Sequence, residues 1–398
     1  MGIIIYSSFN KRKSQRDYWS TDPYLSSQIV SSAMSRDKFE SIKSKVKYSK
    51  LKDNHPNDRG WRVRAVMKLF QKNILLFGYF RTALSIDEMM VKSYARTVLK
   101  QFIKGKPIRF GLKIFSLCTS DGFVLYFDLY CGKNSAIGDR VLNKCAMGSQ
   151  VVMYLLKDFL HKTTLRNISL YHLYFDNFFT SFDLVLHLKK RGLQSTGTIR
   201  ENRIKKDDKI VFDKKATRGT YAVKNDKKSG INYISIIDSK QVSVASSTAG
   251  VTSLLPCRRY SSEEHSKVEI PFPRAIHLYN KYMGGVDIHD MHCNNLLPCI
   301  RAKKWTWVIF VLLIQAAITN SVVLFNAANN ENKKEGTKAF ALSISKYYLD
   351  AAIKNRKKPH ESKRIDKQAK CSSCSIKTYK FCSDCNLYFC KVCFPQSH

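Results

Sequence analysis

Three aspartates at the edges of apolar runs constrain the fold of this chain more than any other feature of its sequence. Asp87 lies inside the run 85–90, Asp176 directly follows an aromatic run, and Asp287 directly follows Val286. An ionised carboxylate leaves water at a large free-energy cost unless it is paired or bound to a metal ion. The sequence therefore predicts a fold that gathers these carboxylates around a cation, as in a metal-dependent nuclease.

The charge balance of the chain indicates a polyanionic partner. Its 398 residues carry 68 Lys and Arg against 31 Asp and Glu, a formal net charge of +37. Such an excess repels itself in a compact fold and exceeds what solubility requires, so we expect nucleic acid as the partner. Solvated lysine faces and a phospholipid surface are the alternatives. A hydrophobic content of 44% supports a folded protein of roughly two to three domains.

The pattern of apolar residues predicts an α/β core. In chain order, we expect a short strand around Asp87, a hairpin over 112–118 and 123–130, a helix over 151–161, a strand over 168–175, a helix over 181–190 and a strand over 196–199. Ser149 is expected to cap the first helix and Gly192 to end the second. This is the order of a ribonuclease H-like core. In that architecture the strands of Asp87 and Asp176 are neighbours, and their carboxylates converge at one end of the sheet.

The second half of the chain completes this expectation. Residues 201–274 carry charge-rich stretches and short β-like runs, and we interpret them as an insertion domain. Gly284 and Gly285 would let the backbone turn tightly and bring Asp287 inward. The apolar run 305–325 is long enough to span a bilayer, but a helix buried against a sheet has the same hydropathy. Polar residues in its second half favour the buried helix, so we expect no membrane partner.

Four motifs together resemble the piggyBac transposases and the piggyBac-derived proteins of cellular genomes. They are Ser-Ile-Asp-Glu at 85–88, Phe-Asp-Asn-Phe-Phe-Thr-Ser at 175–181, Gly-Thr-Ile-Arg-Glu-Asn-Arg at 197–203, and the segment 279–290 with Gly-Gly-Val-Asp at 284–287. They occur in the family's order, and the likeness runs from about Tyr18 to the C-terminus. It implies a cut-and-paste transposase with a ribonuclease H-like domain that acts on double-stranded DNA at transposon terminal repeats. A nuclear location and a homodimer are further expectations.

The resemblance also implies which residues are catalytic. Asp87, Asp176 and Asp287 fall on the family's catalytic positions, and Asp290 falls on a further aspartate that the family uses. Two divalent ions bridged by carboxylates can activate a water or a 3′-hydroxyl and stabilise the leaving oxygen during attack on a phosphodiester. Oxygen ligands favour Mg²⁺ or Mn²⁺. The residues alone leave ordinary structural roles open, such as a strand-end partner of a lysine, a turn cap and a helix N-cap.

The predicted organisation has six parts. They are a truncated dimerisation and DNA-binding region (1–74), the first part of the catalytic core (75–200), the insertion domain (201–274), the last part of the core (275–328), a basic linker (329–370) and a zinc module (371–398). Asp87 comes early in this sequence, whereas the family usually has a long acidic segment ahead of the corresponding aspartate. The alternative function is therefore a domesticated, catalytically idle DNA-binding protein derived from a transposase.

Half of the twelve cysteines lie in the last stretch of the chain. Three Cys-x2-Cys pairs and a histidine are the candidate zinc ligands: Cys371, Cys374, Cys382, Cys385, Cys390, Cys393 and His398. Such pairs in a basic chain without a secretory signal indicate zinc and not disulfides. Seven ligands exceed one tetrahedral site and are one short of two, so we predict one structural zinc and leave a second open. The other six cysteines are predicted to be core thiols.

The charged stretch 355–364 separates the predicted core from the zinc module. Its cluster of Lys and Arg is typical of a nuclear localisation signal or of a solvated tether. A DNA-acting chain needs access to chromosomes, so we expect the localisation signal.

Overall fold

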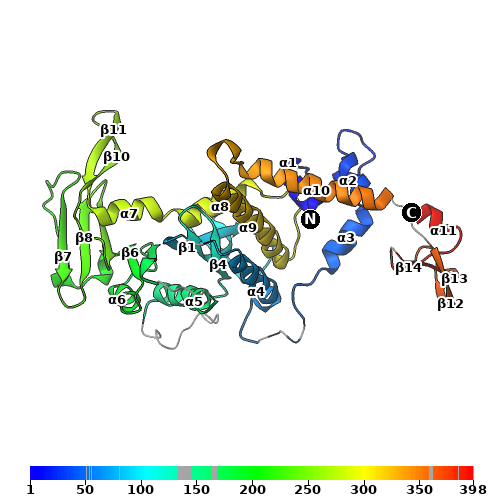
Figure 1. Cartoon of the computed structure of the whole chain (residues 1–398), viewed down its shortest axis with the longest axis horizontal. Helices are drawn as coiled ribbons and strands as arrows, with labels where there is room; N and C mark the ends of the chain where they lie inside the picture. Colours follow the sequence, from blue (N-terminus) through cyan, green and yellow to red (C-terminus); the bar gives the residue numbers. More distant parts are fainter. Residues whose placement is uncertain are drawn as a thin grey trace. The chain divides into compact units, whose positions relative to one another are not determined.

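The computed structural model describes residues 1–397 except 51, 53, 55, 80, 133–144, 163–167, 358–361 and 384. The chain divides into two compact units (Figure 1). The smaller unit combines Met1–Val46, Pro298–Ile300 and Ala341–His398, and the larger unit combines Lys47–Leu297 and Arg301–Phe340. All four candidate catalytic aspartates belong to the larger unit.

A nine-stranded mixed sheet organises the larger unit. Its strand order is β2-β3-β1-β5-β6-β9-β8-β7, and β4 also pairs with β3. β1 is antiparallel to β3 and parallel to β5, and β5 is parallel to β6. The strands are β1 (Ala83–Lys92), β2 (Lys100–Phe102), β3 (Phe110–Thr119), β4 (Val124–Leu129), β5 (His172–Phe175), β6 (Gln194–Thr198), β7 (Tyr221–Asp226), β8 (Ile231–Ile237) and β9 (Gln241–Ser246).

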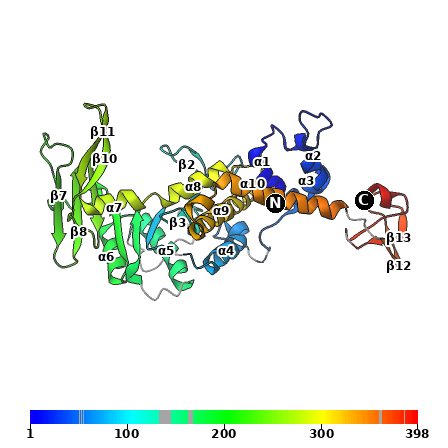
Figure 2. The same cartoon turned by 45° about the horizontal axis from the view of Figure 1, so that its top comes forward.

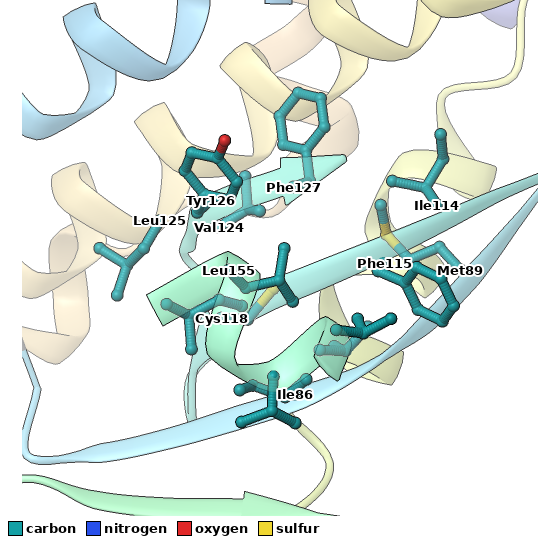
Figure 3. Packing of buried hydrophobic residues seen from close by; sticks show 14 of the residues in the cluster. Ile86, Met89, Ile114, Phe115, Cys118, Val124, Leu125, Tyr126, Phe127 and Leu155 are labelled. Carbon is teal, nitrogen blue, oxygen red and sulfur yellow. The ribbon is translucent and has the colours of Figure 1, made fainter. Parts of the chain in front are cut away.

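Helices cover this sheet and bury its apolar side chains. They are α4 (Trp61–Leu76), α5 (Met147–Lys162), α6 (Phe182–Lys190), α7 (Arg274–Tyr282), α8 (Gly285–Asn295) and α9 (Trp305–Ala328). Figure 3 shows the centre of the core, where Ile86, Phe115 and Phe127 of the strands and Leu155 of α5 pack as fully buried side chains. Burial of each such side chain contributes about 1.5–3 kcal/mol, so the central strands are firmly anchored.

The predicted order of core elements is confirmed, from β1 through the hairpin β3–β4, α5, β5 and α6 to β6. Gly192 has φ +81°, as expected for the residue that ends α6. Three expectations about element bounds were wrong. The strand around Asp87 is not short, because β1 has 10 residues. Residues Ile168–Leu170 form a 3-10 turn, so β5 begins only at His172. Helix α5 begins before Ser149, whose hydroxyl donates to the carbonyl of Phe179 at 3.1 Å in place of capping a helix.

Residues 201–274 contribute strands to the central sheet, which a separate insertion domain would not do. Strands β7, β8 and β9 extend the central sheet through the pairing of β6 with β9. Only β10 (Leu255–Ser261) and β11 (Ser266–Phe272) form a sheet of their own. Ile234 and Val244 pack with Phe272 in a second hydrophobic core. The pairing of β6 with β9 makes this segment continuous with the sheet that contains β1 and β5.

Helix α9 is the one helix in the described residues that is long and apolar enough to cross a membrane by length and composition. Ile309, Leu312 and Leu313 nevertheless belong to the main hydrophobic core. Asn320 accepts a hydrogen bond from the backbone N–H of Val124 and donates one to its carbonyl, both at 2.9 Å. Its side-chain amide thus pairs with the backbone of β4 as a neighbouring strand would. The prediction of a buried helix is confirmed.

The smaller unit is mainly helical. Its elements are α1 (Gly2–Phe9), a 3-10 helix (Gln15–Trp19), α2 (Gln28–Ala33), α3 (Arg36–Lys45), most of α10 (Thr337–Lys357), the strands β12 (Ser362–Lys370), β13 (Lys377–Cys382) and β14 (Leu387–Tyr388), and α11 (Cys393–Ser397). Ser345 of α10 donates a hydrogen bond to the carbonyl of Gly2 at 3.1 Å, which joins α10 to α1.

The expected basic linker over 329–370 is therefore largely regular structure. Helix α10 and strand β12 occupy most of it. Ala341, Ser345 and Leu349 lie four residues apart and are buried, which is the spacing of a helix face. The charged stretch that follows obscured this signal, and residues 358–361 of that stretch lie outside the described residues.

Candidate functional site

The register of two parallel strands brings Asp87 and Asp176 together. Ile86 of β1 lies opposite Phe175 of β5, and the next residue along the chain from each is an aspartate, at the point where β5 ends and β1 continues. The predicted adjacency of these two strands is confirmed. Asp176 directly follows β5, and its Oδ1 accepts a hydrogen bond from the backbone N–H of Phe178 at 2.8 Å. This turn orients the carboxylate beside Asp87.

Helix α8 carries Asp287 in its first turn and Asp290 one turn later. The helix begins at Gly285, where a β-carbon would lie 2.2 Å from the carbonyl oxygen of Thr119 and 2.6 Å from Ser85 Oγ. Glycine is thus needed for close approach to β1 and β3. The expected turn is present at Met283 and Gly284, but Gly285 is already helical. The expectation that the turn brings Asp287 inward was wrong, because the Asp287 side chain remains 71% exposed.

A buried histidine fixes this helix against the sheet. His289 Nδ1 lies 2.9 Å from the carbonyl oxygen of Gly122, and Nε2 lies 3.4 Å from Cys293 Sγ. Complete burial lowers the pKa of His289 to about 4, so the ring is neutral and Nδ1 donates to the carbonyl. No local pattern in the sequence marks His289 as part of the site. This residue positions both aspartates of α8.

Lys106 connects the carboxylates of the strand and the helix. This residue lies between β2 and β3, and its Nζ is 3.8 Å from Asp87 Oδ2 and 3.9 Å from Asp287 Oδ1. Burial acts to lower the pKa of Lys106, but the surrounding carboxylates, with Asp87 first, raise it overall. The ammonium therefore stays charged among the aspartates. Sequence reasoning missed it, because the contact joins residues about twenty and one hundred and eighty positions apart.

Burial disfavours the ionised forms of Asp87, Asp176 and Asp290. Burial raises the pKa of Asp87 to about 8, with Glu88 and Asp176 adding to the shift and Lys106 opposing it. Burial also raises the pKa of Asp176, and it raises that of Asp290 to about 6. Burial and mutual repulsion both disfavour the ionised carboxylates, and a nearby cation would offset both effects. The Lys106 ammonium already lies among these carboxylates. The carboxylate oxygens of the site therefore fit a bound cation.

A second ion pair lies beside the first on β1. Lys113 Nζ lies 3.8 Å from Glu88 Oε2 and 4.7 Å from the ring centres of both Phe115 and Phe178. Burial lowers the pKa of Lys113. Glu88, next to Asp87, thus has its own partner and is oriented by it. We infer that this ion pair supports the site by fixing the strand next to Asp87.

The fit of Gly285 gives a first testable prediction. We expect Gly285→Ala to lower the free energy of unfolding by about 1–3 kcal/mol, because its methyl group would collide with the backbone of β3. Gly284 is the matched control, since a β-carbon at this position would have no atom within 4 Å, and Gly284→Ala should stay within about 0.5 kcal/mol of the parent. Urea unfolding of the three proteins measures the difference. Equal stability of the two variants would contradict the packing of α8 on β1 and β3.

Four cysteines near the C-terminus form a second candidate site. The Sγ atoms of Cys371, Cys374, Cys390 and Cys393 all lie within 4.8 Å of one another. Backbone N–H groups donate to two of these sulfurs, from Cys390 to Cys371 and from Cys393 to Cys390, each at 3.4 Å. Desolvation acts to raise the pKa of Cys371, but hydrogen bonds of this kind outweigh it together and lower the pKa to about 6. Four thiolates at this spacing can hold one tetrahedral metal ion.

Of the other predicted zinc ligands, Cys382 and Cys385 do not join this group. Cys382 is buried in the small core of the module beside Phe389, and Cys385 packs against that core. His398 lies outside the described residues. The structure thus combines the first and third Cys-x2-Cys pairs. Of the six cysteines predicted to be core thiols, Cys118, Cys131 and Cys293 are buried, and the others are half-buried; these are Cys145, Cys257 and Cys299.

Comparisons with known proteins agree with this architecture. The family model described as Transposase IS4 matches residues 1–322. In Homo sapiens, PiggyBac transposable element-derived protein 3 is 29% identical over 421 aligned positions, which cover 100% of this chain and 69% of that protein. The Chimeric ERCC6-PGBD3 protein is 29% identical, with 100% and 38% covered, and PiggyBac transposable element-derived protein 2 is 28% identical, with 93% and 62% covered. The chain therefore spans from 38% to 69% of the length of these relatives.

A solved structure shares the fold. The protein in the cryo-EM structure of the piggyBac transposase synaptic complex with hairpin DNA superposes with a TM-score of 0.71 at 20% sequence identity. The match covers 98% of this chain and 84% of the other. With a family model that covers most of the sequence and a common fold, this chain belongs to the piggyBac transposase family and is a piggyBac-like transposase domain.

Proposed function

We propose that this chain is a metal-dependent DNA strand transferase that cuts transposon ends at their terminal repeats and joins them to new DNA. The observation that carries the proposal is the convergence of strand and helix aspartates on one ammonium, that of Lys106. Double-stranded DNA is the partner that the charge of +37 favours. The neighbouring solved structure is itself a transposase complex with hairpin DNA, which supports the same partner.

We also propose that the catalytic core is ribonuclease H-like. The order β4-β3-β1-β5-β6 within the sheet supports it, with β1 between an antiparallel hairpin and two parallel strands. In this arrangement the central strand β1 and its parallel neighbour β5 supply one aspartate each. Helix α8 supplies the remaining carboxylates from a distant part of the sequence. Sites at the ends of adjoining strands are typical of α/β sheets.

The residues present fit a divalent cation. Asp87, Asp176 and Asp287 would hold it, with Asp290 beside them, and oxygen donors of this kind suit Mg²⁺ or Mn²⁺. When bound, the ion supplies charge stabilisation and an activated attacking oxygen for phosphodiester chemistry. The chain itself does the positioning. The N–H of Phe178 orients Asp176, Asn294 donates to Asp290 at 3.0 Å, and Lys106 supplies positive charge for phosphate oxygens.

We propose Zn²⁺ as the ion for the four-cysteine site. Thiolate donors in Cys-x2-Cys pairs select zinc, and such a site is structural because all four positions are filled by protein. A second zinc at Cys382 and Cys385, with His398 as a further ligand, stays a prediction. The module would support binding of transposon-end DNA by the catalytic unit.

A nicking assay tests the proposed function. We expect the full chain to cut double-stranded DNA that carries its element's terminal repeats when Mg²⁺ or Mn²⁺ is added, and to leave it intact with EDTA. Binding without cleavage under the same conditions would favour the idle DNA-binding alternative. Nuclear location and dimerisation are further proposals, which microscopy of a fluorescent fusion and analytical ultracentrifugation would check.

The role of Lys106 gives a second prediction. Without divalent ions, we expect Lys106→Gln to lower the melting temperature, because it leaves Asp87 and Asp287 without their ammonium. Added Mn²⁺ should raise the melting temperature of the variant more than that of the parent, since a ligand of the folded state stabilises it by linkage. Exposed Lys104 supplies the control, and Lys104→Gln should match the parent in both conditions. An identical Mn²⁺ response in all three proteins would contradict the shared site.

A further inference from the structure

We propose that the hairpin formed by β2 and β3 stacks an unpaired DNA base beside the carboxylate site, with Phe102 and Phe110 as the platform. The proposal rests on the transposase function given above. It adds the form of DNA that the site takes, namely a strand whose bases are unpaired next to the phosphate to be cut.

The two phenylalanines form an exposed aromatic pair. Phe102 ends β2 and lies opposite Phe110, which begins β3. Their ring centres are 4.7 Å apart with an interplanar angle of 40°. The residues are 56% and 60% exposed, so their rings contact each other but are not covered by the core. Adjoining large apolar side chains in water mark an interaction site.

The charge around this pair selects the kind of partner. No Asp or Glu occurs from Met89 to Ser120. The same stretch carries seven basic residues, Lys92, Arg96, Lys100, Lys104, Lys106, Arg109 and Lys113. Lys104 and Arg109, on the turn between the two strands, are exposed. Aromatic rings on a segment that carries many cations and no acidic residue complement bases joined by phosphates.

The hairpin turn is also fastened to the catalytic carboxylates. Lys106 lies four residues from Phe102 and four from Phe110, and its Nζ contacts both Asp87 and Asp287 within 4 Å. Figure 2 shows the β2 hairpin projecting from the sheet of the larger unit. A phosphate at the carboxylates would therefore place its neighbouring nucleotides near the aromatic pair.

The exposed ring faces require a base that is not already stacked. In continuous duplex each base is covered on both faces by its neighbours, so a phenylalanine cannot stack on it without unstacking the helix. A frayed or cut end offers a free base face at no such cost. Stacking on an aromatic side chain strengthens binding about 10- to 100-fold per base and tolerates any sequence. The hairpin would thus hold an opened DNA end at the site.

Binding to two matched DNAs tests the proposal. Both carry the same terminal repeat; one is continuous duplex, and the other has three unpaired bases beside the cleavage position. Fluorescence anisotropy without Mg²⁺ or Mn²⁺ measures affinity independently of cleavage. We expect Phe102→Ala/Phe110→Ala to weaken binding of the unpaired-base DNA about 10- to 100-fold, and binding of the duplex by less than about threefold. Tyr347→Ala, at a residue 72% exposed in the smaller unit, should change neither.

The outcomes test the aromatic platform and the transposase function separately. Equal losses on both DNAs, or no loss on either, would overturn the aromatic platform and leave the transposase function standing. Failure of the parent protein to bind either DNA would overturn the proposed function itself. If the alanine variant has a lower melting temperature than the parent, binding by Phe102→Trp/Phe110→Trp tests the aromatic platform in its place. This variant keeps an aromatic pair and must retain the preference for unpaired bases.

Discussion

Asp176→Asn is expected to abolish DNA cleavage while leaving the fold intact. The substitution removes one charged ligand from the proposed metal site, and several kcal/mol of lost transition-state stabilisation correspond to a rate loss of about a thousandfold. The amide retains an Oδ1 atom that can accept the hydrogen bond from the N–H of Phe178. Burial already disfavours the charged form of Asp176, so a neutral side chain should not lower stability. Nicking of labelled terminal-repeat DNA and thermal melting measure the two effects.

A nearby acidic residue supplies the control for this experiment. Asp183 lies exposed in the first turn of α6, and Asp183→Asn should cut DNA at the parental rate. Both variants should bind terminal-repeat DNA with parental affinity, because neither loses a positive charge. Retention of nicking by Asp176→Asn would refute the assignment of the carboxylate site. Loss of nicking in both variants would point to a general dependence on acidic residues.

The strand half of the site was predictable from the sequence because it depends on local pattern. Apolar and aromatic runs indicate that the segments of β1 and β5 are strands, although the length of β1 and the start of β5 were not predicted. Once the order of elements is known, the adjacency of β1 and β5 follows from the fold. Asp87 and Asp176 therefore needed little information beyond their own segments, and their strand register agrees with that expectation.

The helix half depended on contacts that no local pattern contains. Gly285 was assigned to a tight turn, whereas its lack of a side chain serves the approach of α8 to Thr119. His289 and Lys106 contact residues far away in the sequence, so neither their pairing nor their burial could be derived from spacing. Sequence placed the aspartates, but the residues that position and neutralise them became visible only in three dimensions.

The cysteine module shows the same division. Each Cys-x2-Cys pair is a local knuckle and was identified as such. Which pairs share an ion depends on how β13 and the following turns fold, and the structure joins the first pair to the third. The intervening Cys382 shares the small core with Phe389 and three of these cysteines, but its sulfur is not part of the four-sulfur group. A count of ligands alone could not make that choice.

Loss of the metal from the four-cysteine site is expected to unfold the C-terminal module. Its core holds few apolar side chains, with Phe389 as the largest buried one, so burial alone cannot balance the conformational entropy of the segment. Zinc binding to such a site contributes about 10–16 kcal/mol, and that free energy is lost on chelation. Hydrogen exchange should show residues 371–397 losing protection, while β1 and β5 of the larger unit stay protected.

Replacing one ligand should have the same local effect as chelation. We expect Cys374→Ser to lower the zinc content by one ion per chain, because Cys374 Sγ lies within the four-sulfur group. Cys257→Ser is the matched control, since Cys257 is a half-buried thiol of β10 outside that group, and its zinc content should equal that of the parent. Atomic absorption on purified protein measures the content. A parent protein without zinc would refute the metal assignment, whereas an equal loss in both variants would show that the content reflects general destabilisation and not ligation.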